Sequence, residues 1–122
     1  MLYDTTQIAL ERTIQGASVR NEALAANLAN ANTPGYQRVD VDFHGALSAA
    51  LDERTGATRR AAVQTSTFGA VADATGPMRA DGSTVDVDAE SAKLAANGLE
   101  HQTAVSIASA RLSILRTAMG VA

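Results

Sequence analysis

The residue types that carry most enzyme chemistry are sparse in this chain and poorly arranged for catalysis. His44 and His101 are the only histidines, and they do not form the helically spaced pair that a metal or acid–base site uses. The chain has no cysteine, which excludes disulfide frameworks, zinc knuckles and thiol chemistry. The aspartates do not follow the order of a calcium loop. We therefore expect no enzyme activity, no metal and no cofactor.

Composition indicates one small domain with an unusual core. The 122 residues are 46% hydrophobic but only 3% aromatic, so a core must be built from Ala, Leu, Val and Ile. The net charge is -3 and the arginines are scattered, which argues against nucleic acid as a partner. We expect a single domain over residues 1–122.

A long helix is predicted near the N-terminus, with its region spanning residues 1–32. Between residues 4 and 31 there is no proline and one glycine, and the composition favours helix. Apolar residues recur at alternating steps of four and three, which forms one stripe of a heptad pattern. The stripe positions are Leu10, Ile14, Ala17, Asn21, Leu24, Leu28 and Ala31. Asn21 is the polar exception, and such a residue can fix the register of paired helices.

A second long helix is predicted within residues 83–122. Asp81-Gly82 signals a turn before it, and Asp88 is the expected N-cap. The same four-three spacing recurs at Leu94, Gly98, His101, Val105, Ala108, Leu112, Leu115 and Met119. We expect these two stripes to pair, with Leu10, Ile14, Leu24 and Leu28 facing Val105, Leu112, Leu115 and Met119.

The segment between the two helices, residues 33–82, begins at a sharp turn. Thr33-Pro34-Gly35-Tyr36 suits a type II turn, because Pro and Gly occupy its two central positions. Asn27 and Asn30 precede it; they are either exposed capping residues or hold the following backbone by side-chain hydrogen bonds. Beyond the alternating segment 39–43 and a brief helical patch at 46–51, we expect a loosely structured middle with possible short strands.

The predicted fold is therefore mainly α, with the terminal helices paired as a coiled coil around an irregular middle. Two thin, Ala-rich helices bury only modest area, which is little for a stable monomer of this size. An ordinary helical hairpin and a subunit that completes its packing in an assembly both fit the stripes, and we favour the assembly. A small soluble all-helical chaperone or binding module is the alternative from another class.

Three segments resemble the bacterial flagellar axial proteins, a family of rod, hook and junction subunits. Ala25-Ala26-Asn27-Leu28-Ala29-Asn30-Ala31-Asn32-Thr33-Pro34-Gly35-Tyr36 is similar to their N-terminal signature, including Asn27, Asn30 and the turn Thr33, Pro34, Gly35 and Tyr36. Asp81 to Glu90 and Asn97 to Gln102 resemble the C-terminal segment of the proximal rod type. The chain is too short for the outer domain of hook and distal-rod subunits. Another short rod subunit is the alternative within the family.

The resemblance implies a structural role. Family members pair their terminal helices into coiled coils, which pack into a hollow helical tube that transmits torque from motor to hook. The implied partners are further copies of the chain, other rod subunits, an adaptor to the membrane ring and the flagellar type III export apparatus. No nucleic acid or small-molecule substrate is implied.

The resemblance also changes the expected location. Residues 1–16 lack a basic start followed by an apolar stretch, so the residues alone predict a protein that stays where it is made. The family instead implies a periplasm-spanning rod whose subunits are exported without a cleaved signal. Phe43 and Leu47 resemble the short motif that docks early subunits at the export gate, although Phe43 suits a packing role equally well.

Overall fold

The computed structural model describes residues 4–120 and is mainly helical. In chain order the elements are α1 (Thr5–Ala29), β1 (Val39–Asp40), α2 (Phe43–Leu51), α3 (Gly56–Thr65), β2 (Val71–Ala72) and α4 (Val87–Ala118). The predicted fold class is confirmed, since the two long terminal helices pack against each other and the middle contains a short two-stranded sheet.

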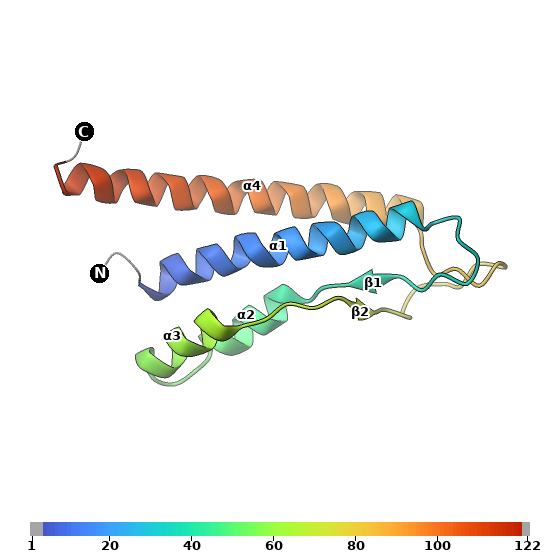
Figure 1. The fold of residues 1–122 in the computed structure, drawn as a ribbon, viewed down its shortest axis with the longest axis horizontal. Helices are drawn as coiled ribbons and strands as arrows, with labels where there is room; N and C mark the ends of the chain where they lie inside the picture. The colour runs from blue at the N-terminus through green and yellow to red at the C-terminus, as the bar shows by residue number, and fades with distance from the viewer. Residues whose placement is uncertain (1–3, 121–122) are drawn as a thin grey trace.

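Helix α1 lies at the centre of an elongated molecule. Figure 1 shows α4 running antiparallel along one side of α1, while α2, α3 and the strands lie along the other side. The strands pair antiparallel, with Val39 opposite Ala72 and Asp40 opposite Val71. The start of α1 and the end of α4 therefore lie toward one end of the molecule, and the loops that join α1 to β1 and β2 to α4 lie at the other (Figure 1).

Acidic caps begin both long helices. Asp4 accepts a hydrogen bond from the Gln7 backbone N–H and caps α1, which ends at Ala29, three residues before the predicted boundary. The prediction of Asp88 as the cap of α4 is wrong. The cap is Asp86, whose extended backbone lets its side chain accept from the N–H groups of Asp88 and Ala89. Asp88 instead lies in the first turn, where its charge still suits the helix dipole.

The middle of the chain is more helical than its sequence predicts. The patch expected at 46–51 is the second half of α2, whereas α3 was not predicted. Thr55 caps α3 by accepting from the Thr58 N–H, and the fully buried Val63 fixes the helix to the core. The alternating segment 39–43 forms a strand only at Val39–Asp40, because Phe43 already begins α2.

The main hydrophobic core lies between α1 and the α2–α3 pair, and not between the two long helices. Its buried members are Ile8, Ala17, Ala23, Val41, Phe43, Leu47, Ala50 and Val63. Phe43 packs directly on Gly16, where a Cβ atom would come within 2.6 Å of the ring. The single large ring of this core therefore depends on a glycine in the facing helix.

Candidate functional site: a polar seam and an exposed apolar helix face

Polar residues join α4 to α1 along a line with heptad spacing, which we call the polar seam. Glu90, Asn97 and Ala104 are the buried residues of α4, each seven positions after the last. Asn97 donates from Nδ2 to the Ala17 carbonyl at 2.8 Å. One further heptad along, Arg111 pairs with Asp4 at the start of α1. Hydrogen bonds and an ion pair thus link the two long helices at three heptad positions of α4, residues 90, 97 and 111.

At the loop end of this seam, Arg38 is the centre of a buried ionic cluster. Its side chain donates to three carboxylates: Nε to Glu90 at 2.8 Å, Nη2 to Asp40 at 3.2 Å, and Nη1 to Asp73. Arg38 is only 4% exposed and Glu90 only 1%. A guanidinium with several donors in a fixed fork suits this geometry. The cluster joins β1, the residue after β2, and α4.

Asn27 links α1 to the same cluster and to the strand. Its Oδ1 accepts from the Val39 N–H at 2.9 Å, and its Nδ2 donates to the Val39 carbonyl at 2.7 Å, so the side-chain amide pairs with the backbone as a neighbouring strand would. Nδ2 also donates to Glu90 at 2.8 Å. Asn27 is fully buried, and all these contacts satisfy it. We call Asn27, Arg38, Asp40, Asp73 and Glu90 the polar junction.

The junction shifts the pKa values of Arg38, Asp40 and Asp73 toward the charged forms. Burial lowers the pKa of Arg38, but the hydrogen bonds and charges of Glu90, Asp73 and Asp40 together outweigh this effect and raise it. Burial likewise raises the pKa of Asp40, yet the Arg20 hydrogen bond, 2.8 Å long, and the Val41 N–H bring it below its usual value. Hydrogen bonds from Thr75, with help from Arg38, lower the pKa of Asp73 to about 2.

The turn after α1 is held against the segment that precedes α4. Tyr36 N–H donates to the Thr33 carbonyl at 3.2 Å and Gly35 has φ 72°, which are features of the predicted type II turn. Gly35 donates to Asp81, and Thr84 donates to the Tyr36 carbonyl. Asn30 binds locally, donating to Ala26 and accepting from Thr33. Pro34 is exposed at the tip.

Several residues predicted to lie between the two long helices are exposed instead. Leu24 is buried, and Leu10, Ile14, Leu28 and Leu115 are half-buried. The expected pairing of α1 with Val105, Leu112 and Met119 is not what the structure shows, because these three side chains are largely exposed. The buried positions of α4 lie one residue before the predicted ones, with Ala104 in place of Val105. The two other buried positions, Glu90 and Asn97, are polar. Asn21 is exposed, and the buried asparagine of α1 is Asn27.

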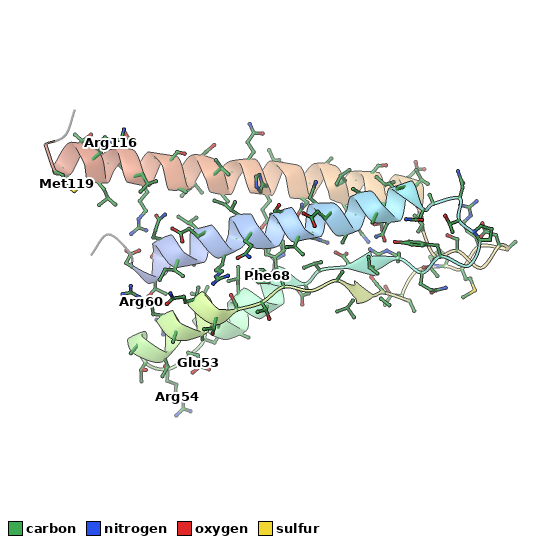
Figure 2. The ribbon with its side chains drawn as sticks, in the orientation of Figure 1. Glu53, Arg54, Arg60, Phe68, Arg116 and Met119 are labelled. Carbon is green, nitrogen blue, oxygen red and sulfur yellow. The ribbon has the colours of Figure 1, made fainter. Side chains whose placement is uncertain are left out.

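The predicted export motif lies in the hydrophobic core. Phe43 is fully buried and contacts the ring of Phe68 edge-on at a centroid distance of 6.1 Å. Leu47 is buried one turn later on α2. His44 points outward and lies 2.5 Å from Glu100 of α4. Figure 2 shows Phe68 beside α2 and α1, and Glu53, Arg54 and Arg60 around the α2–α3 end.

Sequence reasoning missed Arg38 and Asp73 as structural residues, and it included Glu90 and Asn97 only within the segments that resemble the proximal rod type. The sequence gives only a weak indication of a structural role for Arg38, which is the single charged residue in the short stretch between Tyr36 and Val39. Long-range ion pairs have no local pattern, so only the fold brings residues 38, 73 and 90 together.

Within residues 4–120, no cluster of three or more histidine, aspartate or glutamate side chains could hold a metal ion. The helices of that same part of the chain are too polar or too short to cross a membrane.

Comparison with known proteins assigns the chain to a class of flagellar components. Residues 7–37, which contain most of α1 and the turn, match the family described as flagella basal body rod protein. The flagellar basal body rod protein FlgB of Escherichia coli K12 is 39% identical over 106 residues, covering 76% of this chain and 77% of its own length. The FlgB proteins of Aeromonas hydrophila and Cereibacter sphaeroides are 33% and 35% identical, with at least 82% of each chain covered.

The chain belongs to the FlgB family of flagellar basal-body rod proteins. It is a structural subunit of the proximal rod, and its place is in the flagellum with other rod components. The relatives are structural proteins and not enzymes.

Proposed function

We propose that the α1–α4 hairpin is the building block of the rod and that hairpins pack side by side into a hollow, helically arranged tube. In this proposal the tube transmits torque from the motor to the hook, and the chain has no catalytic activity. The observation that carries it is the character of α4, which buries Glu90 and Asn97 while several of its large apolar side chains are at least half exposed: Leu99, Ile107, Leu112 and Ile114.

The exposed apolar surface of α4 is too extensive for an isolated helix in water. Within residues 4–120, seven of the ten large exposed apolar side chains belong to α4 or its C-cap: Val87, Leu99, Val105, Ile107, Leu112, Ile114 and Met119. Exposed apolar side chains gathered on one helix mark an interaction site. Burial against neighbouring subunits would complete the packing that α1 alone does not supply.

The polar junction supports a mechanical role. Its ion pairs and amide contacts join α1, β1 and α4 at the loop end, so the two long helices cannot slide without breaking buried charge pairs. Removing one partner from such a buried pair is strongly unfavourable. A subunit that transmits torque needs this resistance to shear between its helices.

The test separates assembly from folding. Leu112→Asp places a charge on an exposed α4 position, so the purified variant keeps the helical content and thermal midpoint of the original chain. In a strain that lacks the gene, it fails to restore rods and swimming, because the apolar contact is lost. Ser109→Asp, another exposed position of α4, is the matched control and restores both. Normal swimming with Leu112→Asp would contradict the proposal.

We further propose that the chain binds other copies of itself, other rod subunits, an adaptor to the membrane ring and the export apparatus. Export without a cleaved signal would place it in the periplasm-spanning rod. No nucleic acid or small-molecule substrate is part of this function, in keeping with the scattered arginines and the net charge of -3.

Phe43 and Leu47 act in this proposal as an export-gate motif that only the unfolded chain presents, since both are buried after folding. Phe43→Ala therefore traps the subunit in the cytoplasm. Val63→Ala removes part of an equally buried side chain from the same core and leaves secretion intact. Equal secretion of the two variants would reduce Phe43 to a packing residue.

A further inference from the structure

The apolar side chains that α4 exposes form two separate ridges. The first ridge is Leu99, Ile107 and Ile114, which are 67%, 50% and 69% exposed, and the second is Val105, Leu112 and Met119, at 39%, 50% and 59%. At 3.6 residues per turn, the centres of the two ridges are about half a turn apart around the helix. They therefore occupy opposite flanks of α4, with the α1 contact between them on one side.

The first ridge borders a groove and the second does not. Leu99 and Ile107 line a depression of about 450 Å³ together with Ala104 of α4 and with Leu10 and Thr13 of α1. Ala96, Thr103 and Glu100 complete its lining, in which Glu100 is the one charged residue. The second ridge projects from the other flank as a row of single side chains spaced by seven residues. A row with this spacing is the shape that fits between two packed helices.

Charge is complementary between the two flanks. Glu100, which also contacts His44, lies at the groove and is partly exposed, whereas Arg116 follows Leu112 by one turn on the flank of the second ridge and is exposed. Figure 2 shows Arg116 near the free end of α4, away from the α2–α3 layer. A copy that inserts its second ridge into the groove of a neighbour brings an arginine toward a carboxylate.

We propose that the second ridge of one copy of this chain packs into the groove of the next copy. This inference rests on the proposed function and specifies the surface by which identical subunits meet. The contact is heterologous, so each copy uses one flank to receive a neighbour and the other flank to enter the next. Such contacts continue from copy to copy and build an array, whereas an isologous contact would stop at a dimer.

The size of each contact explains why the array forms only with many subunits. Three partly exposed side chains on each flank fall far below the roughly 1,200 to 2,000 Å² that a stable two-chain interface buries. A lone pair of copies therefore dissociates, whereas a copy within the array is held on both flanks.

The chain has no cysteine, so single introduced thiols report contacts directly. Groove variants Leu99→Cys and Ile107→Cys are each co-expressed with ridge variants Val105→Cys and Leu112→Cys in a strain lacking the gene. Basal bodies are then treated with a thiol-specific cross-linker with a short spacer. Cells that express one groove variant together with one ridge variant give linked dimers of this chain, whereas cells that express a single variant give none. Ser109→Cys, on the exposed face between the ridges, is the control and stays unlinked with every partner.

The outcomes separate this inference from the proposed function. If the unmodified chain fails to restore rods and swimming, the proposed function fails. If rods form, links between identical variants, links only to a different protein, or no links in any of the four mixed combinations each overturn the groove-and-ridge contact between copies.

Discussion

Arg38 is the residue on which the polar junction depends. It is nearly inaccessible to solvent, and its three carboxylate partners come from different parts of the chain. Such a cluster adds little net stability compared with an apolar core, but it strongly penalises every arrangement that leaves a charge unpaired. The residue therefore specifies how the helices and the strand meet.

Replacing Arg38 with Ala should lower the free energy of unfolding by about 3 kcal/mol, because the buried Glu90 then loses its main cationic partner. Urea denaturation followed by circular dichroism measures this change. Arg54→Ala removes an exposed arginine and should shift stability by less than about 0.5 kcal/mol. Equal stability of the two variants would mean that the junction has no structural role.

The junction also makes stability depend on acid. The pKa of Asp73 falls to about 2 in the folded chain and that of Asp40 is also lowered, so their stabilising contribution is complete above their unfolded pKa values near 3.9. It is lost as the pH falls from about 5 toward about 2. Asp73→Asn should therefore be less stable at neutral pH but lose less stability on acidification than the original chain. Glu22→Gln, an exposed change on α1, should leave the acid dependence unaltered. If the urea midpoints of Asp73→Asn and of the original chain changed equally with pH across this range, Asp73 would not be a source of the acid dependence.

At this scale the sequence was partly informative. The sequence indicates a structural role for Asn27, because this residue precedes a proline-containing turn, where a side-chain amide commonly binds the backbone. Its actual partners, Val39 and Glu90, lie 12 and 63 residues away. The separation of Asn27 from Glu90 explains why local patterns could suggest a role for Asn27 and no role for Arg38.

Among the elements, α1 is central because it presents two different faces. One face is apolar and packs against α2 and α3, and the other accepts polar contacts from α4. Gly16 belongs to the apolar face and admits Phe43 at close range, whereas Gly98 of α4 has open space where a side chain would begin. The two glycines sit inside helices for different reasons.

The same substitution at these glycines should have opposite effects. Gly16→Ala forces a Cβ atom to within 2.6 Å of the Phe43 ring and should destabilise by about 1 to 3 kcal/mol, despite the better helix propensity of alanine. Gly98→Ala meets no atom within 4 Å and should stabilise by about 0.5 to 1 kcal/mol. Thermal or urea unfolding distinguishes them, and a gain in stability at Gly16 would refute the packing argument.

The sequence predicted the long helices because proline-free, Ala-rich stretches favour helix whatever they pack against. It did not predict the register of α4, since the heptad stripe was assigned to its apolar residues and the structure places Glu90 and Asn97 inward. It also missed α3, whose Thr- and Arg-rich sequence has a single buried anchor in Val63. Pattern reasoning assumes that apolar residues turn inward, whereas α4 buries Glu90 and Asn97 and exposes several large apolar side chains.

For the whole molecule, the unequal lengths of the long helices matter. Arg111 pairs with Asp4 at the very start of α1, and α4 continues to Ala118. The last seven helical residues therefore project about 10 Å past that ion pair. Figure 1 shows this free end of α4 extending beyond the beginning of α1.

Hydrogen exchange should report this difference along α4. In the isolated chain, amides near Asn97 should exchange slowly because α1 covers that stretch, and amides after Arg111 should exchange faster because, within residues 4–120, they lie beyond the start of α1. In assembled rods the second group should become protected. Strong protection of both groups in the isolated chain would contradict the role given to the exposed ridges.

Asn27, Arg38, Asp73 and Glu90 are spread over more than half of the chain, and this spacing has a consequence in time. A nascent chain leaves the ribosome N-terminus first, so Arg38 emerges long before Glu90, the most deeply buried of its carboxylate partners. Until Glu90 follows, the first helix and the strand lack the partner that holds them together. The polar junction therefore cannot be completed until residue 90 has been synthesised.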